Sequence, residues 1–208
     1  MTASSLEARK RTAVESFGCA ASTIGRVSPG MSLFSVTRGQ WSMIDAVLHV
    51  LDEVGLARIS LWTWTVAEYE VQVLTRLRED RRLTGGRLVI DAGARKKNAG
   101  IIREWKDSFG ESSVRYVTNH AKMARIESTS GLKLLLRGSI NLNFNPRFEQ
   151  FDITEGGADF SLVTEIEDGL PVLSDSCTGT QVWAASQVGR AFRAEQLQIF
   201  SRMKVWAK

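Results

Sequence analysis

Two short polar segments hold the side chains of this sequence that are best suited to chemistry. The first is His120–Lys122 (HAK), and the second, Gly138–Asn141 (GSIN), starts sixteen positions after the lysine. An imidazole can attack an electrophile or move protons near neutral pH. An ammonium, a hydroxyl and an amide supply donors for phosphate oxygens. Gathered around one point, these groups would suit reaction at a phosphate diester, and they would need no metal ion.

A pair of neighbouring strands could bring the two segments together. Alternate residues of a strand point to the same face, so an extended segment Asn119–Glu127 would direct His120 and Lys122 into one pocket. A turn at Ser128–Gly131 would let the next strand, Leu132–Arg137, run back alongside the first. The end of that second strand would then place the GSIN segment beside the histidine.

The rest of the hydrophobic pattern predicts an α/β domain. Further strands are expected at 31–36, 57–65, 87–91, 113–117 and 149–154, and helices at 41–54, 69–77 and 97–109. Strands that alternate with helices favour parallel pairing, and a hairpin adds antiparallel pairs. We therefore expect a mixed, largely parallel sheet flanked by helices.

The N-terminal segment 1–30 is expected to lie outside this domain. A capping-box pattern predicts a helix over Leu6–Phe17, and the small residues of Gly18–Gly30 predict a linker. The domain would then extend from Met31 to Lys208 and close with a helix at Gln187–Trp206.

Composition narrows the classes of protein. An apolar fraction of 43% is enough for a core, and no stretch approaches the roughly 18 apolar residues that a membrane span needs. A secretory signal is not expected, because the first residues contain no apolar segment, and we expect a cytoplasmic protein with no membrane partner. Cys19 and Cys177 lie far apart and lack zinc-type spacing, so we expect two free thiols, no metal and no cofactor.

A formal net charge of +4 permits a polyanionic partner without requiring one. Basic residues cluster at 9–11, 76–82 and 95–97, and each cluster alone is typical of a solvated surface. The third cluster follows a predicted strand, where open α/β sheets place ligands. Trp62 and Trp64 could stack on bases, but their alternation along a strand favours burial in the core.

The two polar segments resemble the signature of the phospholipase D superfamily. That signature is a His-x-Lys motif, an aspartate five positions after the lysine, and a Gly-Ser/Gly-x-Asn motif. Here Glu127 stands at the aspartate position. Glu149 matches the polar or acidic residue that family members have after the asparagine, and Asp152 is the weaker match. The resemblance extends over Trp41–Thr154, is weak before His120, and implies a phospholipase D-like fold.

The resemblance also implies a homodimer. The active site of the family uses two motifs related by twofold symmetry. The second histidine of this chain, His49, is not followed by a lysine two positions later, so the chain has a single motif. One motif from each subunit would meet at the twofold axis.

The resemblance implies roles for five residues. One His120 would attack phosphorus to give a phosphohistidine, and the second would protonate the leaving oxygen and then activate water. Lys122 and Asn141 would hold the phosphoryl oxygens. Ser139 would assist them, and Glu149 would orient a histidine.

Single-motif relatives are often small nucleases, so the resemblance favours a metal-independent nuclease that acts on DNA or RNA. Glu127 and the missing second motif leave open a non-catalytic nucleic-acid-binding or scaffolding protein on the same fold. A lipid-directed or other phosphatidyl-transfer enzyme is a second alternative, and the absence of membrane-binding segments argues against it. An unrelated α/β domain with a coincidental motif is a third.

Overall fold

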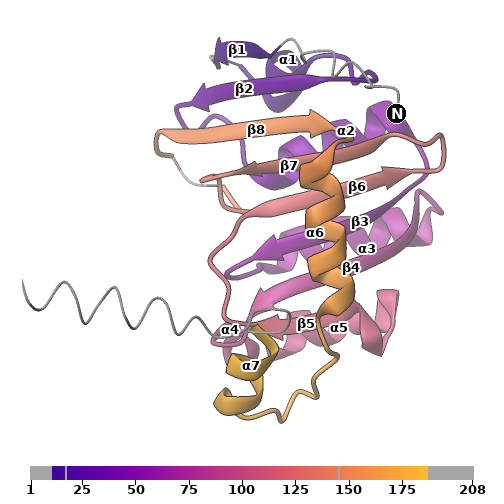
Figure 1. Cartoon of the computed structure of the whole chain (residues 1–208), viewed down its shortest axis with the longest axis vertical. Helices are drawn as coiled ribbons and strands as arrows, with labels where there is room; N and C mark the ends of the chain where they lie inside the picture. The colour runs from indigo at the N-terminus through magenta and orange to yellow at the C-terminus, as the bar shows by residue number, and fades with distance from the viewer. Residues whose placement is uncertain (1–10, 17, 145, 187–208) are drawn as a thin grey trace, which may run out of the picture.

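The computed structural model describes residues 11–16, 18–144 and 146–186. An eight-stranded mixed sheet runs through this part of the chain (Figure 1). Its strands are β1 (Thr12–Glu15), β2 (Ser32–Thr37), β3 (Ala57–Thr63), β4 (Leu83–Asp91), β5 (Val114–Val117), β6 (Met123–Ser128), β7 (Lys133–Gly138) and β8 (Glu149–Glu155). They lie in the order β1-β2-β8-β7-β6-β3-β4-β5. Within this sheet, β6 and β8 run opposite to the remaining six strands.

Helices cover both faces of the sheet. They are α1 (Ala20–Ile24), α2 (Met43–Val54), α3 (Glu68–Glu79), α4 (Ala94–Lys97), α5 (Ala99–Phe109), α6 (Ala158–Gly169) and α7 (Gly179–Ser186). Figure 1 shows α2, α3 and α5 behind the sheet and α6 lying across its front. The expected mixed sheet flanked by helices is therefore confirmed, with three parallel and four antiparallel pairs of neighbouring strands in the described part of the chain.

Strand alternation divides the core between the two faces. Leu134 and Leu136 of β7 belong to the large cluster that packs with α2, α3 and α5. Leu135, which lies between them, instead contacts Phe160 and Val163 of α6. Successive side chains of a strand point to opposite faces, so each central strand supports helices on both sides.

The N-terminal segment differs from the sequence-based prediction. Thr12–Glu15 forms a strand that pairs in parallel with β2, where a helix over Leu6–Phe17 was expected. Ala20 and Ile24 of α1 are buried in the main cluster, so this stretch is part of the core and not a linker before Met31. Short-range pattern failed here because the strand is specified by pairing with β2, which begins at Ser32, beyond the local window.

An ion-pair network fixes α6 to the sheet. Glu167 is fully buried, and its carboxylate accepts hydrogen bonds from Arg125 of β6 at 2.7 Å and from Trp62 of β3 at 2.8 Å. Arg87 of β4 pairs with the same carboxylate at 3.3 Å and with Asp168 at 2.9 Å. Three strands are thereby joined to one helix by charge-assisted hydrogen bonds.

The sequence also led to expectations about a C-terminal helix, the two cysteines and membrane spans. The helix predicted at Gln187–Trp206 lies outside the described residues. Cys19 and Cys177 are free thiols, the first exposed and the second buried, as expected. None of the helices in the described ranges is long and apolar enough to cross a membrane.

Candidate active site

The residues singled out in the sequence gather at one edge of the sheet. This edge, which we call the motif edge, is formed by the carboxyl ends of β3, β4, β5 and β7 and the amino ends of β6 and β8. His120 follows β5, and Lys122 immediately precedes β6. Ser139 follows β7, and Glu149 begins β8. Loops at such an edge are the usual place for binding residues in open α/β sheets.

His120 lies in a loop, not in the strand that was expected. Strand β6 begins at Met123, so both His120 and Lys122 precede it. The loop bends because the buried side chain of Asn119 accepts a hydrogen bond from the backbone N–H of Ala121 at 2.9 Å. Local bonds of this kind between an asparagine side chain and the backbone compete with strand pairing.

Asn119 also ties this loop to two parallel strands. Its amide group donates to the carbonyl oxygen of Thr63, at the end of β3, over 2.9 Å. Its backbone N–H donates to Oδ2 of Asp91, at the end of β4, over 2.9 Å. Asn119 was not singled out from the sequence, where the only signal was an asparagine directly before the histidine.

The His120 side chain is exposed and available. Its ring lies 6.3 Å from the ring of Trp64, centroid to centroid. Within the described ranges, neither ring nitrogen of His120 forms a hydrogen bond. The imidazole is thus held by the backbone of its loop while both nitrogens remain open to a ligand.

The two polar segments are in direct contact. The backbone N–H of Gly138 donates to the carbonyl oxygen of Lys122 over 3.2 Å. The Lys122 ammonium donates to the carbonyl oxygen of His120 over 3.3 Å. The β6–β7 hairpin therefore brings the HAK and GSIN segments side by side, as the sequence predicts.

Gly138 permits a close approach of β7 to β8. A Cβ atom at this position would lie 2.2 Å from the carbonyl oxygen of Gln150, which belongs to the backbone. Beyond this contact, Ser139 accepts a hydrogen bond from the N–H of Gln150 at 3.0 Å and donates its own N–H to the Gln150 carbonyl over 3.1 Å. The glycine of the motif thus has a structural role in placing Ser139.

We expect Gly138→Ala to lower the free energy of unfolding by about 1–3 kcal/mol, because β8 must shift to relieve the overlap. The same shift should displace Ser139 and Glu149. Urea denaturation would measure the change in stability. Gly100→Ala is the matched control, since a Cβ there meets nothing within 4 Å. Equal stability of the two variants would contradict this assignment.

Ser139 and Glu149 form a pair across the β7–β8 connection. The Ser139 hydroxyl donates a hydrogen bond to Oε2 of Glu149. Asp152, the weaker match, lies three positions further along β8 and therefore on the opposite face. There it pairs with Arg137 at 3.1 Å and with Arg11. Of the two acidic residues, Glu149 is the one that accompanies the GSIN segment.

Asn141 joins the motif edge to α2. Its carbonyl oxygen accepts a hydrogen bond from the N–H of Met43, the first residue of α2, at 3.0 Å. In the part of the chain that the structure describes, its side-chain amide has no hydrogen-bond partner. The backbone of Asn141 is therefore fixed while its amide group stays free.

Glu127 lies away from the motif edge. A strand rises about 3.3 Å per residue, so five positions place it roughly 16 Å along β6 from Lys122. Its carboxylate contacts Arg125 at 3.5 Å and Lys133 at 3.9 Å. The residue at the aspartate position of the motif thus forms ion pairs with Arg125 and Lys133 and is not part of the candidate site.

The position of Trp64 corrects one expectation. Trp64 is 55% exposed, because β3 ends at Thr63, so its expected burial in the core was wrong. Trp62 is half-buried and bonded to Glu167. In the basic segment 95–97, Arg95 donates to the carbonyl oxygen of Cys177 over 2.8 Å.

The segment between α6 and α7 bonds to α5 and to β5, the strand that precedes the His120 loop. Asp175 accepts hydrogen bonds from Lys106 at 2.7 Å and from Tyr116 at 2.6 Å. These donors, the Lys106 ammonium first, lower the pKa of the Asp175 carboxyl from its ordinary value. Ser186 of α7 then accepts the backbone N–H of Thr118 at 2.7 Å, two residues before His120.

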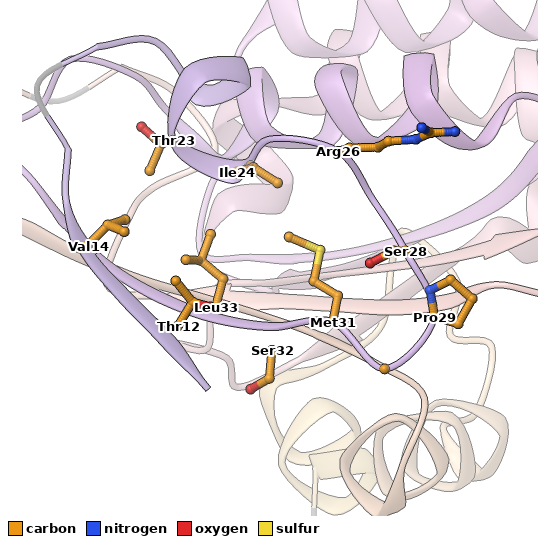
Figure 2. A pocket seen from close by; sticks show the side chains of 11 residues that line it. Thr12, Val14, Thr23, Ile24, Arg26, Ser28, Pro29, Met31, Ser32 and Leu33 are labelled. Atoms are coloured by element: carbon orange, nitrogen blue, oxygen red, sulfur yellow. The ribbon is translucent and has the colours of Figure 1, made fainter. Parts of the chain in front are cut away.

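A pocket near the N-terminus and the second histidine, His49, both lie away from the motif edge. The pocket, of about 380 Å³, lies between β1, β2 and α1, at the opposite end of β2 from the motif edge. Figure 2 shows the side chains that line it. His49 lies on α2 and hydrogen-bonds the carbonyl oxygen of Gly25 at 2.7 Å. Neither place adds a second copy of the motif.

The side of the sheet that faces α6 has a groove next to the motif edge. It has a volume of about 440 Å³ and is lined by Arg11, Phe34, Ala121, Lys122, Met123, Arg137, Gly138, Gln150 and Asp152. Among the described side chains, no three His, Cys, Asp or Glu residues gather as metal ligands.

Comparison with models of known protein families gives no match, and comparison with curated proteins gives none either. A solved structure that is similar to this chain is that of Nuc from Salmonella typhimurium, described as a phospholipase D family member. It is 16% identical, with a TM-score of 0.43, and the match covers 66% of this chain and 93% of that one.

Proposed function

We propose that this protein is a phosphodiesterase of the phospholipase D type that cleaves nucleic acids without a metal ion. The observation that supports the proposal most strongly is the direct contact between the HAK and GSIN segments through the Gly138–Lys122 hydrogen bond. Around this contact stand an available imidazole, an ammonium and an unpartnered amide. Two motifs that are separate in the sequence thus belong to one place in the fold.

The proposed reaction has two steps with His120 as nucleophile. A ring nitrogen of His120 attacks phosphorus, and the bond from phosphorus to the leaving oxygen breaks with transfer of its electron pair to that oxygen. An imidazolium supplies the proton that the leaving oxygen takes up. The resulting imidazole then removes a proton from water, whose oxygen attacks phosphorus and releases His120.

The second imidazole of this scheme comes from a second copy of the chain. The described part of the chain has its second histidine, His49, on α2 and bonded to Gly25, so it cannot supply the acid. A homodimer that pairs the two motif edges would provide His120 of the partner subunit. Lys122 and Asn141 would donate to the phosphoryl oxygens, where negative charge increases in the transition state.

Glu149 and Ser139 complete the proposed site. Ser139 is fixed by hydrogen bonds to Gln150 and to Glu149, so its hydroxyl is oriented before substrate binds. Glu149 provides a carboxylate at the same edge that can accept the N–H of an imidazole and raise its basicity. Both residues act by positioning the groups that touch the phosphate.

We expect hydrolysis of single- or double-stranded DNA or RNA to continue at full rate in the presence of excess EDTA. No step of the proposed reaction uses a metal ion, and the nucleophile is a side chain. Turnover on the four nucleic acids and on a phosphatidylcholine vesicle would be followed before and after chelation. Activity that disappears with EDTA and returns with a divalent cation would contradict the proposal, and activity on the vesicle alone would favour a lipid substrate.

A non-catalytic nucleic-acid-binding protein is the second candidate. Glu127 replaces the aspartate of the motif, and unpaired cations such as Lys97 and Arg147 lie exposed in the described part of the chain. Salt-dependent binding of nucleic acid without turnover on any substrate would favour this candidate.

A further inference from the structure

We infer that Trp64, with Lys97, forms a subsite that binds an unpaired nucleobase next to His120, so that the preferred substrate is a single strand. This inference rests on the proposed function, because it assigns a substrate class to the same site. Its first basis is the position of Trp64. The indole is 55% exposed although Trp41 and Trp105 of the same chain are buried to 2% and 0% exposure.

Trp64 borders a pocket of about 340 Å³ on the motif edge. The pocket is lined by Trp64, Thr65, Asp91, Gly93, Ala94 and Lys97. Its lining comes from the last residue of β4 and from the segments that follow β3 and β4, two neighbouring parallel strands. A planar ring that enters the pocket would lie against the indole, and base stacking on an aromatic side chain tolerates any base sequence.

Polar groups in and beside the pocket suit a nucleotide. The carboxylate of Asp91 is oriented by the N–H of Gly93 at 2.8 Å and the N–H of Asn119 at 2.9 Å. Each carboxylate oxygen keeps a free lone pair that can accept an exocyclic amine of a base. Lys97 forms no ion pair within the described ranges, so its ammonium is available to a neighbouring phosphate.

The contact between Trp64 and His120 links this pocket to the reaction. The two ring centroids are 6.3 Å apart. One sugar separates a base from its own phosphate, so a base on Trp64 and a phosphate at His120 can belong to a single nucleotide. A paired base cannot leave its stack without a cost of a few kcal/mol, which is why the subsite favours single strands.

The test measures equilibrium binding, so that it does not depend on turnover. A labelled single-stranded oligonucleotide is bound to protein that contains His120→Ala, which leaves the strand intact. In this background Trp64→Ala should raise the Kd roughly 5- to 100-fold, and Trp64→Phe should restore most of the affinity. Trp183→Ala is the matched control, because that indole is 51% exposed on α7 and does not line the pocket; its Kd should not change.

An abasic strand of equal length separates base stacking from phosphate binding. It should bind less tightly than the normal strand, and Trp64→Ala should not weaken it further. Equal binding of both strands, or an unchanged Kd in Trp64→Ala, would overturn the inference. Conversion of a dimer to a monomer by Trp64→Ala in sedimentation would also overturn it, because the indole would then be covered by a second subunit.

The outcome is distinguishable from failure of the proposed function. Base-dependent binding through Trp64 without hydrolysis would uphold the subsite and refute the catalytic proposal. Hydrolysis that is insensitive to Trp64 would refute the subsite and uphold catalysis.

Discussion

Replacing His120 with alanine should reduce phosphodiesterase turnover by roughly 10⁴-fold or more, because a phosphohistidine can no longer form. The fold should survive, since the ring is exposed and none of the described residues hydrogen-bonds to it. The loop itself is positioned by Asn119, through bonds to Thr63 and Ala121, and these remain in the variant. Turnover on the preferred nucleic acid is the measurement, with circular dichroism and sedimentation to check fold and subunit association.

His49→Ala is the control for loss of a histidine. His49 lies on α2, where its ring bonds the Gly25 carbonyl, so the variant should keep its turnover. Residual activity above about one tenth in His120→Ala would contradict the role of nucleophile. Activity lost to the same degree in both variants would show a general effect on the fold.

Replacing Glu167 with alanine should lower the free energy of unfolding by about 3–5 kcal/mol, the usual cost of removing one partner from a buried ion pair. The substitution leaves Arg125, whose side chain is 7% exposed, without the carboxylate that it contacts at 2.7 Å. Trp62 loses its hydrogen-bond acceptor as well. Urea denaturation, monitored by tryptophan fluorescence, would measure the change in the free energy of unfolding.

Asp168→Ala provides a control from the adjacent position. Asp168 also pairs with Arg87, at 2.9 Å, but its side chain is 62% exposed. An exposed pair of this kind contributes about 0–1 kcal/mol because water screens it. If the two variants lost equal stability, the network under α6 would not depend on burial as we describe it.

The sheet centre and the motif could be predicted from the sequence because their signals are local. The apolar residues of β7 and the turn before it specify the hairpin, and the hairpin brings the two polar segments together. The detailed geometry could not be predicted in the same way. His120 and Lys122 lie before β6 because Asn119 bends the chain, and that bend depends on Thr63 and Asp91 of distant strands.

Three features were missed for a related reason. Strand β1 has mostly exposed residues and is stabilised by pairing with β2, which short-range pattern does not contain. Helix α6 was not predicted because a charged residue, Glu167, lies on its buried face. An apolar residue there would have made the helical spacing of hydrophobic residues visible in the sequence. Trp64 was expected to be buried because it continues the alternating pattern of β3. The strand ends at Thr63, however, and beyond its end alternation no longer predicts burial.

The β6–β7 hairpin has a consequence for how this site can tolerate insertions. Met123 pairs with Arg137 beside the motif edge, and Glu127 pairs with Lys133 next to the turn at the far end. Adding one residue within β7 would exchange its two faces and direct Leu134 toward α6 and Leu135 toward α2. An addition of two residues would preserve both faces. An insertion of one residue within β7 should therefore disturb the packing on both faces of the sheet, whereas an insertion of two residues shifts the register but keeps each side chain on its own face.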